Sequence, residues 1–119
     1  MHSQNLGKKG EELAVKVLET AGMSIIARNT RSRYGEIDLV ALDKETIVFI
    51  EVKTWSVYDI EELQYSLDFR KQRRIIKTAK YFLSAHREYS KMAIRFDVVF
   101  IKEDSVIHLA SAFPELYDG

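Results

Sequence analysis

The sequence predicts an α/β domain in which helices flank a mixed β-sheet, with elements in the order α-β-β-β-α-β-β. Two observations favour this class. Apolar residues recur at helical spacing near the amino terminus and again after residue 68. Short apolar or alternating segments, separated by polar turns, lie between and after these helices. With 119 residues the chain is expected to be a single domain, residues 1–119, large enough for a hydrophobic core.

The amino-terminal half is expected to contain one helix and three strands. The helix runs from about Leu6 to Ala21, where Gly22 ends it. A first strand, MSIIARN, leads into a basic loop, RNTRSRYG, and two more strands follow at about Glu36–Leu42 and Thr46–Lys53. The basic loop supplies a first group of candidate nucleic-acid contacts: Arg28, Arg31 and Arg33.

The carboxyl-terminal half is expected to contain a second helix and two strands. Residues Thr54–Asp68 show no clean period and predict a loop with one short helical turn. A strongly amphipathic helix follows at about Phe69–His86, and then the strands IRFDVVFI and SVIHL, separated by the turn KED. Arg95 alternates with Asp97 in the first of these strands, which indicates a structural ion pair.

The composition excludes several kinds of site. The chain has no cysteine, which removes disulfides and thiolate metal sites, and its three histidines show no ligand spacing. It contains no G-x-S-x-G, P-loop or G-x-G-x-x-G motif. No apolar run approaches the roughly 20 residues that span a bilayer. The amino terminus has no signal-peptide pattern, so a cytoplasmic protein without membrane contact is expected.

The net charge is zero, but the charges are unevenly distributed. Arg70 to Lys80 contains six basic residues and no acidic one, whereas Asp59 to Asp68 contains four acidic residues and no basic one. The basic side chains fill one arc of the expected second helix, which is either a phosphate-binding surface or a solvated exterior. Together with the arginine-rich loop they favour a nucleic-acid partner. The candidate contacts on the helix are Arg70, Lys71, Arg73, Arg74 and Lys77.

A second candidate site lies in the stretch GEIDLVALDKETIVFIEVK, where three charged residues stand among apolar ones. If Lys44-Glu45 forms the tip of a two-residue hairpin, Asp38 lies opposite Glu51 on the same face, with Cβ atoms roughly 5 Å apart. Alternation puts Lys53 on that face as well. A one-residue slip of register would move Asp38 to the other face.

Two aligned carboxylates suit a hard divalent cation such as Mg²⁺, which is commonly bound by one or two carboxylates, waters and substrate phosphates. A lysine two residues beyond a ligand could then hold an attacking water or meet the charge that develops on a phosphate. The alternative interpretation is a Lys–Glu ion pair on a solvated sheet face, with Asp38 merely nearby.

The segments GEIDLVA and VFIEVKT resemble the metal-binding core of the PD-(D/E)xK nuclease superfamily, whose pattern is an Asp followed, after a gap, by Glu-x-Lys. More narrowly, GKKGEELAVKVLETAG, RNTRSRYGEIDLVA, FIEVKT, RKQRRI and RFDVV follow the order typical of the bacterial YraN-like family. That family is similar to archaeal Holliday-junction resolvases. The resemblance covers nearly the whole chain and implies a restriction-endonuclease-like fold.

The resemblance also implies roles for individual residues. Asp38 and Glu51 would bind Mg²⁺ or Mn²⁺ together with the backbone carbonyl of Val52, and Lys53 would be the catalytic lysine. Glu11, in the GE pair of the first helix, would be an accessory acidic residue. Related nucleases often carry a polar helix residue near the metal, and Gln72, which falls among apolar positions of the second helix, is the candidate for it.

The function expected from these observations is a divalent-metal-dependent endonuclease that hydrolyses phosphodiester bonds in DNA, with branched or junction DNA among its candidate substrates. A homodimer is compatible with this function, because nuclease relatives that cut both strands usually act as symmetric pairs. The alternative is a non-catalytic nucleic-acid-binding or adaptor module that retains the nuclease fold. A purely structural protein-interaction domain is the third interpretation.

Overall fold

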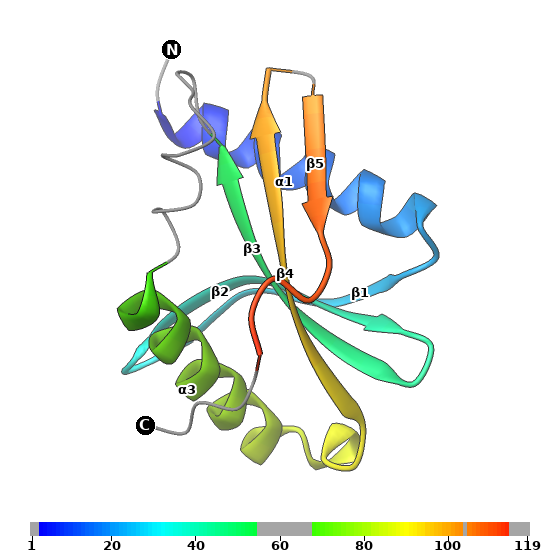
Figure 1. Ribbon diagram of the computed structural model, residues 1–119, viewed down its shortest axis with the longest axis vertical. Coiled ribbons are helices and arrows are strands. Elements are labelled where there is room, and N and C mark those ends of the chain that lie inside the picture. The colour runs from blue at the N-terminus through cyan, green and yellow to red at the C-terminus, as the bar shows by residue number, and fades with distance from the viewer. Residues whose placement is uncertain (1–2, 55–67, 104, 115–119) are drawn as a thin grey trace.

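The computed structural model describes residues 3–54, 68–103 and 105–114, which form a five-stranded mixed sheet with a helix on each face (Figure 1). The strands lie side by side in sequence order: β1 (Ser24–Ser32), β2 (Gly35–Asp43), β3 (Thr46–Thr54), β4 (Ala93–Lys102) and β5 (Ser105–Leu109). Neighbours are antiparallel except β3 and β4, which are parallel and joined through helix α3 (Phe69–Ala85). The predicted α/β class and element order are confirmed.

Helix α1 (Ser3–Thr20) covers one face of the sheet. Ala14, Val15 and Leu18 pack there against apolar residues of the central strands, such as Val48 and Ile50. The helix ends where the sequence predicts. Gly22 adopts φ +97°, its N–H donates to the Glu19 carbonyl, and the Met23 N–H donates to the Leu18 carbonyl. This is a Schellman motif, which requires the left-handed conformation that glycine adopts without strain.

Helix α3 covers the opposite face. Asp68 caps its first turn by accepting a hydrogen bond from the Lys71 N–H at 3.0 Å. Its apolar stripe includes Ile76 and Phe82, and the Phe82 ring meets Phe49 of β3 edge to face, with ring centroids 5.9 Å apart. The charged arc of the helix faces away from this core, as its amphipathic pattern predicts.

One sequence prediction about the amino-terminal half is wrong. The expected basic loop is strand: β1 continues to Ser32, which pairs with Gly35, so Arg28 and Arg31 are strand residues and the connection is short. The polar composition suggested a loop. However, β1 is an edge strand, where polar side chains are tolerated, and its pairing with β2 satisfies the backbone hydrogen bonds. Asn29 adopts φ 51°, a conformation that asparagine tolerates better than most residues.

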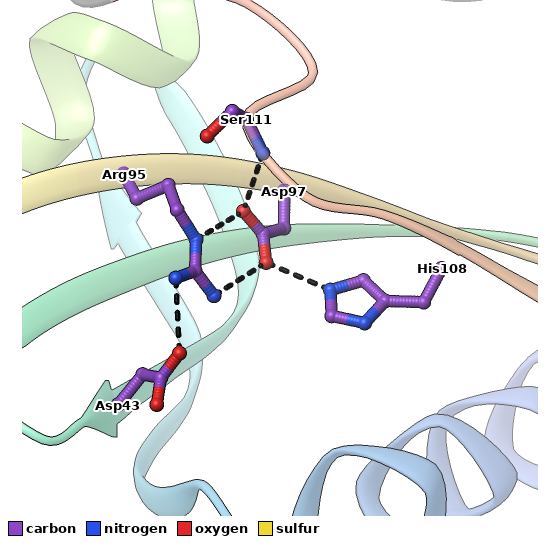
Figure 2. Close-up of polar contacts among 5 residues, drawn as sticks. All are labelled: Asp43, Arg95, Asp97, His108 and Ser111. Carbon is purple, nitrogen blue, oxygen red and sulfur yellow. Dashed lines mark hydrogen bonds and ion pairs between the residues drawn. The ribbon is translucent and has the colours of Figure 1, made fainter. Parts of the chain in front are cut away.

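The expected ion pair between Arg95 and Asp97 exists and belongs to a larger network on the face of the sheet that α1 covers (Figure 2). Asp97 is 1% exposed and accepts hydrogen bonds from Arg95 Nε (2.9 Å), Arg95 Nη2 (3.0 Å) and the Ser111 N–H (3.0 Å). His108 Nε2 lies 2.7 Å from the same carboxylate, and Arg95 also pairs with Asp43 at 2.9 Å.

This network has a structural role, because the buried Asp97 carboxylate is hydrogen-bonded by Arg95, His108 and Ser111. Burial alone would raise the pKa of Asp97, but hydrogen bonds from Arg95, His108 and Ser111 outweigh burial and lower the pKa below its ordinary value. The Ser111 contact also holds the chain after β5 against β4. There, the Ala112 N–H donates to the Phe96 carbonyl at 2.7 Å.

The predicted loop over residues 54–68 falls almost entirely outside the described residues. Within the described ranges, no helix is long and apolar enough to cross a membrane.

Replacing Asp97 with Asn is expected to lower the free energy of unfolding by about 2–4 kcal/mol, because Arg95 loses its buried partner while the side-chain shape is kept. Urea unfolding followed by circular dichroism measures the change. The exposed Glu88→Gln variant is the control and should stay within about 0.5 kcal/mol of the parent protein. Equal stabilities of the two variants would show that the network adds nothing.

Candidate functional site

The β2–β3 hairpin brings Asp38 and Glu51 together. Its register runs from the Asp43–Thr46 pair to the Leu39–Ile50 pair, which is the register predicted from a Lys44-Glu45 tip. Val40 and Phe49 both pack in the core beneath α3, so alternation places Asp38 and Glu51 on that same face. Beyond the last of these pairs, the Val52 N–H donates to Asp38 Oδ2 at 2.7 Å.

The two carboxylates strongly affect each other. Glu51 is buried, with 8% of its surface exposed, and Asp38 is half-buried. Burial, and next the negative charge of Glu51, raise the pKa of Asp38 from 3.8 to about 7, against the opposing hydrogen bond from Val52. A hydrogen bond between the two carboxyl groups adds to the shift. Asp38 therefore keeps its proton to a higher pH than usual, because its ionisation would place a second negative charge beside Glu51.

Two lysines neutralise the remaining charge. Lys71 Nζ of α3 lies 2.6 Å from Glu51 Oε2, and Lys53 Nζ lies 3.9 Å from the same oxygen. Burial, and next the neighbouring Lys71 ammonium, lower the pKa of Lys53. Burial also acts to lower the pKa of Lys71, but its hydrogen bond to Glu51 outweighs that influence and the pKa is raised. A lysine with a lowered pKa beside two carboxylates is typical of functional sites.

Glu11 reaches this site electrostatically from α1. Its charge contributes to the raised pKa of Asp38. The close approach of the helix depends on Gly10: a Cβ atom there would lie 2.9 Å from Thr54 Oγ1, at the end of β3. A side chain at position 10 would therefore push the first turns of α1, and Glu11 with them, away from the strand that carries Glu51.

A pocket of about 290 Å³ opens beside the two carboxylates. The volume is sufficient for a phosphate group and several waters. The sequence-predicted Gln72 is half-buried on α3 and is not among the described residues that line this pocket. The lining residues are Gly35, Glu36, Asp38, Glu51, Lys71, Arg74 and Ile75.

The predicted basic residues fall into two groups. On β1, Arg28 is paired with Glu12 at 2.7 Å and Arg31 with Glu36 at 3.5 Å. On α3, the basic arc borders the pocket directly through Lys71 and Arg74. The α3 residues Arg70, Arg73 and Lys77 are exposed.

Sequence reasoning missed an aromatic residue in this surface. Tyr34, at the turn of the β1–β2 hairpin, has the Arg33 guanidinium 5.0 Å and the Lys77 ammonium 5.2 Å from its ring centroid. Hydrogen bonding to Arg33 lowers the pKa of the Tyr34 hydroxyl. The hairpin is held to α3 by the contact between Ser32 Oγ and Thr78 Oγ1 at 2.8 Å. The sequence signal that could have identified Tyr34 is an aromatic residue inside the basic segment RSRYG.

The chemistry of the donors fits a divalent cation at Asp38 and Glu51. The half-buried Asp38 and the buried Glu51 lie side by side with carboxylate oxygens that a metal ion could take as ligands, and Mg²⁺ needs only one or two protein carboxylates. In the described part of the chain, no three His, Cys, Asp or Glu side chains are arranged to hold a metal ion. The site therefore fits a cation that keeps waters or phosphate oxygens as its other ligands.

The fold and the site define a class: an α/β protein with a close pair of carboxylates beside a basic helix. A model of the uncharacterised protein family UPF0102 matches residues 10–101. The UPF0102 protein of Treponema pallidum (strain Nichols) is 43% identical over 122 residues, which cover 97% of each chain. The UPF0102 protein of Persephonella marina is 40% identical over 113 residues, which cover 95% of this chain and 97% of the relative.

The UPF0102 protein of Francisella tularensis (strain WY96-3418) is 36% identical over 114 residues, with coverage of 95% and 97%. The chain therefore belongs to the UPF0102 family, and membership in this YraN-like family confirms that part of the predicted resemblance. The range that the family model matches contains Gly10, Glu11, both carboxylates of the pair and Lys71.

The raised pKa of Asp38 predicts an unusual pH dependence of stability. Because the folded value is about 7 and the ordinary value is 3.8, the folded state binds the proton more tightly. The contribution of the Asp38 proton to the free energy of unfolding is complete below about pH 4 and is lost as the pH rises through 7. Between pH 5 and pH 8 the free energy of unfolding of the parent protein should fall by about 2 kcal/mol relative to that of Asp38→Asn. Urea unfolding at both pH values measures it, and parallel pH profiles for the two proteins would contradict the assignment.

Proposed function

We propose that this protein is a Mg²⁺- or Mn²⁺-dependent endonuclease that hydrolyses phosphodiester bonds in DNA, with branched or junction DNA among its substrates. The observation that carries the proposal is the close placement of the Asp38 and Glu51 carboxylates beside Lys53. The pair opens into a pocket that the basic arc of α3 borders. The resemblance to PD-(D/E)xK nucleases supports the same reaction.

In this proposal Asp38, Glu51 and the Val52 carbonyl hold the cation, and Glu11 adjusts the negative charge of the site. The cation, when bound, supplies Lewis acidity that lowers the pKa of a coordinated water. Lys53 donates a hydrogen bond that orients the attacking water, and its lowered pKa makes the ammonium a better proton donor to nearby oxygens.

The chemical step is an in-line displacement at phosphorus. The water oxygen bonds to phosphorus as the bond from phosphorus to the 3′ oxygen breaks, the water loses a proton and the departing oxygen gains one. Lys71 and Arg74, which line the pocket, contact the phosphate oxygens and stabilise the added negative charge. Gln72 is kept as the candidate polar helix residue of the site, although it is not among the described residues that line the pocket.

The surface around the pocket supplies the DNA contacts. Basic side chains of α3 neutralise backbone phosphates, and Tyr34, between Arg33 and Lys77, offers a ring on which an unpaired base can stack. Stacking favours DNA with exposed bases, such as flaps and junctions. The proposal takes the chain as a single cytoplasmic domain, acting as a homodimer where both strands are cut.

A second candidate function is a metal-independent nucleic-acid-binding or adaptor module. The contact between Lys71 and Glu51 favours it, because the Lys71 ammonium already compensates Glu51 without a metal, and the pKa of Asp38 is raised. The two functions differ in their need for cations.

A cleavage panel tests the proposed reaction. Linear, single-stranded, flapped and four-way DNA are incubated with Mg²⁺ or Mn²⁺, and cleavage is expected on at least one branched substrate. Glu51→Gln and Lys53→Met should each reduce its rate by about 10²-fold or more, and Lys53→Met should keep DNA affinity within about threefold of the parent protein. Binding that persists in chelator, without cleavage of any substrate, would favour the adaptor.

The DNA surface predicts a graded loss of affinity. Arg74→Gln and Lys77→Gln should each weaken DNA binding and reduce the salt slope of log Kd by about 1. Tyr34→Ala should weaken binding to single-stranded more than to duplex DNA. Fluorescence anisotropy at several salt concentrations measures these effects. Lys16→Gln, an equal charge change on exposed α1, is the control, and a similar loss in that variant would point to nonspecific electrostatics.

A further inference from the structure

Lys71 occupies an unusual position for a residue of a DNA-binding arc. Its ammonium lies 2.6 Å from Glu51 Oε2, whereas Lys53, on the same strand as Glu51, lies 3.9 Å away. The Lys71 side chain is 28% exposed and that of Glu51 is 10% exposed. The contact is therefore a short, partly desolvated ion pair, which is stronger than an exposed one.

The anchor of this contact is the first turn of α3. The Lys71 N–H donates to the Asp68 side chain, so the backbone at residue 71 is held at the capped end of the helix. From that point a flexible four-carbon stem carries the ammonium into the pocket, which Arg74 lines one turn further along. Lys71 can thus reach either Glu51 or a phosphate in the pocket without movement of the helix.

A divalent cation at Glu51 would compete with this ammonium. Lys71 already contacts Oε2 of this carboxylate, and two positive groups on one carboxylate repel each other. The protein binds a cation only in the fraction of molecules in which Lys71 has left Glu51, so its apparent cation affinity is reduced by that fraction. A phosphate in the pocket offers Lys71 another anionic partner.

We propose that Lys71 couples nucleic-acid binding to metal binding. Without a phosphate, its ammonium pairs with Glu51 and hinders cation binding there. A DNA phosphate attracts the ammonium away from Glu51, and the carboxylate becomes available to the cation. This inference rests on the proposed metal site and adds an order of assembly to it. DNA and the cation then raise each other's affinity by the same factor, as linkage requires. Lys71 has two effects in this account: it contacts the phosphate, and it controls access of the cation to Glu51.

The test is cation binding itself, measured without reference to cleavage. Free Mn²⁺ is quantified by its electron paramagnetic resonance signal during titration of the protein, with and without a non-cleavable phosphorothioate duplex. Lys71→Met should bind Mn²⁺ about tenfold more tightly than the parent protein in the absence of DNA, the factor that corresponds to ~1.4 kcal/mol. The enhancement of Mn²⁺ affinity by DNA should shrink to less than about twofold in the same variant.

Three further variants make the result specific. Lys71→Gln should behave as Lys71→Met does, which guards against a folding effect of one substitution. Lys71→Arg retains a cation at the position and should keep the weak, DNA-enhanced Mn²⁺ binding. Lys80→Met removes an equal charge from an exposed position of the same helix and should leave Mn²⁺ affinity unchanged.

Each contrary outcome is informative. If Lys71→Met and the parent protein bind Mn²⁺ equally while Asp38→Asn does not bind it, the coupling is overturned and the metal site stands. If none of the proteins takes up Mn²⁺ at millimolar concentration, with or without the duplex, the metal site fails and the coupling fails with it.

Discussion

The structure depends on one constraint, which is that the β2–β3 register places two acidic side chains next to each other on a largely buried sheet face. Asp38 and Glu51 cannot both ionise there without a compensating positive charge. In the protein alone, the Lys71 ammonium compensates Glu51, and the pKa of Asp38 is raised. The neighbouring elements bring further charge to this pair: Glu11 from α1, and Lys71 and Arg74 from α3.

The contrast with Asp97 favours the acidic pair as the candidate site. Asp97 is more deeply buried, yet four donors surround it and its pKa falls below the ordinary value. Asp38 has the Val52 N–H and a second carboxylate as its partners, and its pKa rises. A buried acid surrounded by donors stabilises the fold, whereas two carboxylates that repel each other retain a capacity for an external cation. The two lie on opposite faces of the sheet, so a ligand at one does not disturb the other directly.

Local patterns were sufficient to predict much of this arrangement. The two-residue tip at Lys44-Glu45 set the register that aligns Asp38 with Glu51, and Gly22 marked the end of α1 because only the left-handed conformation closes that helix. The strand character of Arg28 and Arg31 was not predictable, since it depends on pairing with β2 rather than on composition. The Lys71 contact could not be predicted from the sequence either. Helical periodicity placed Lys71 on a charged arc, but it does not predict how far the flexible side chain reaches into the pocket.

The central claim is that Asp38, beside Glu51, exchanges its proton for a divalent cation. Isothermal titration calorimetry with Mn²⁺ at pH 6.5, in buffers of different ionisation enthalpy, counts the protons released on binding. The account predicts release of about one proton per cation in the parent protein and no comparable release in Asp38→Asn. Cation uptake without proton release would contradict the claim, as would the same release in both proteins.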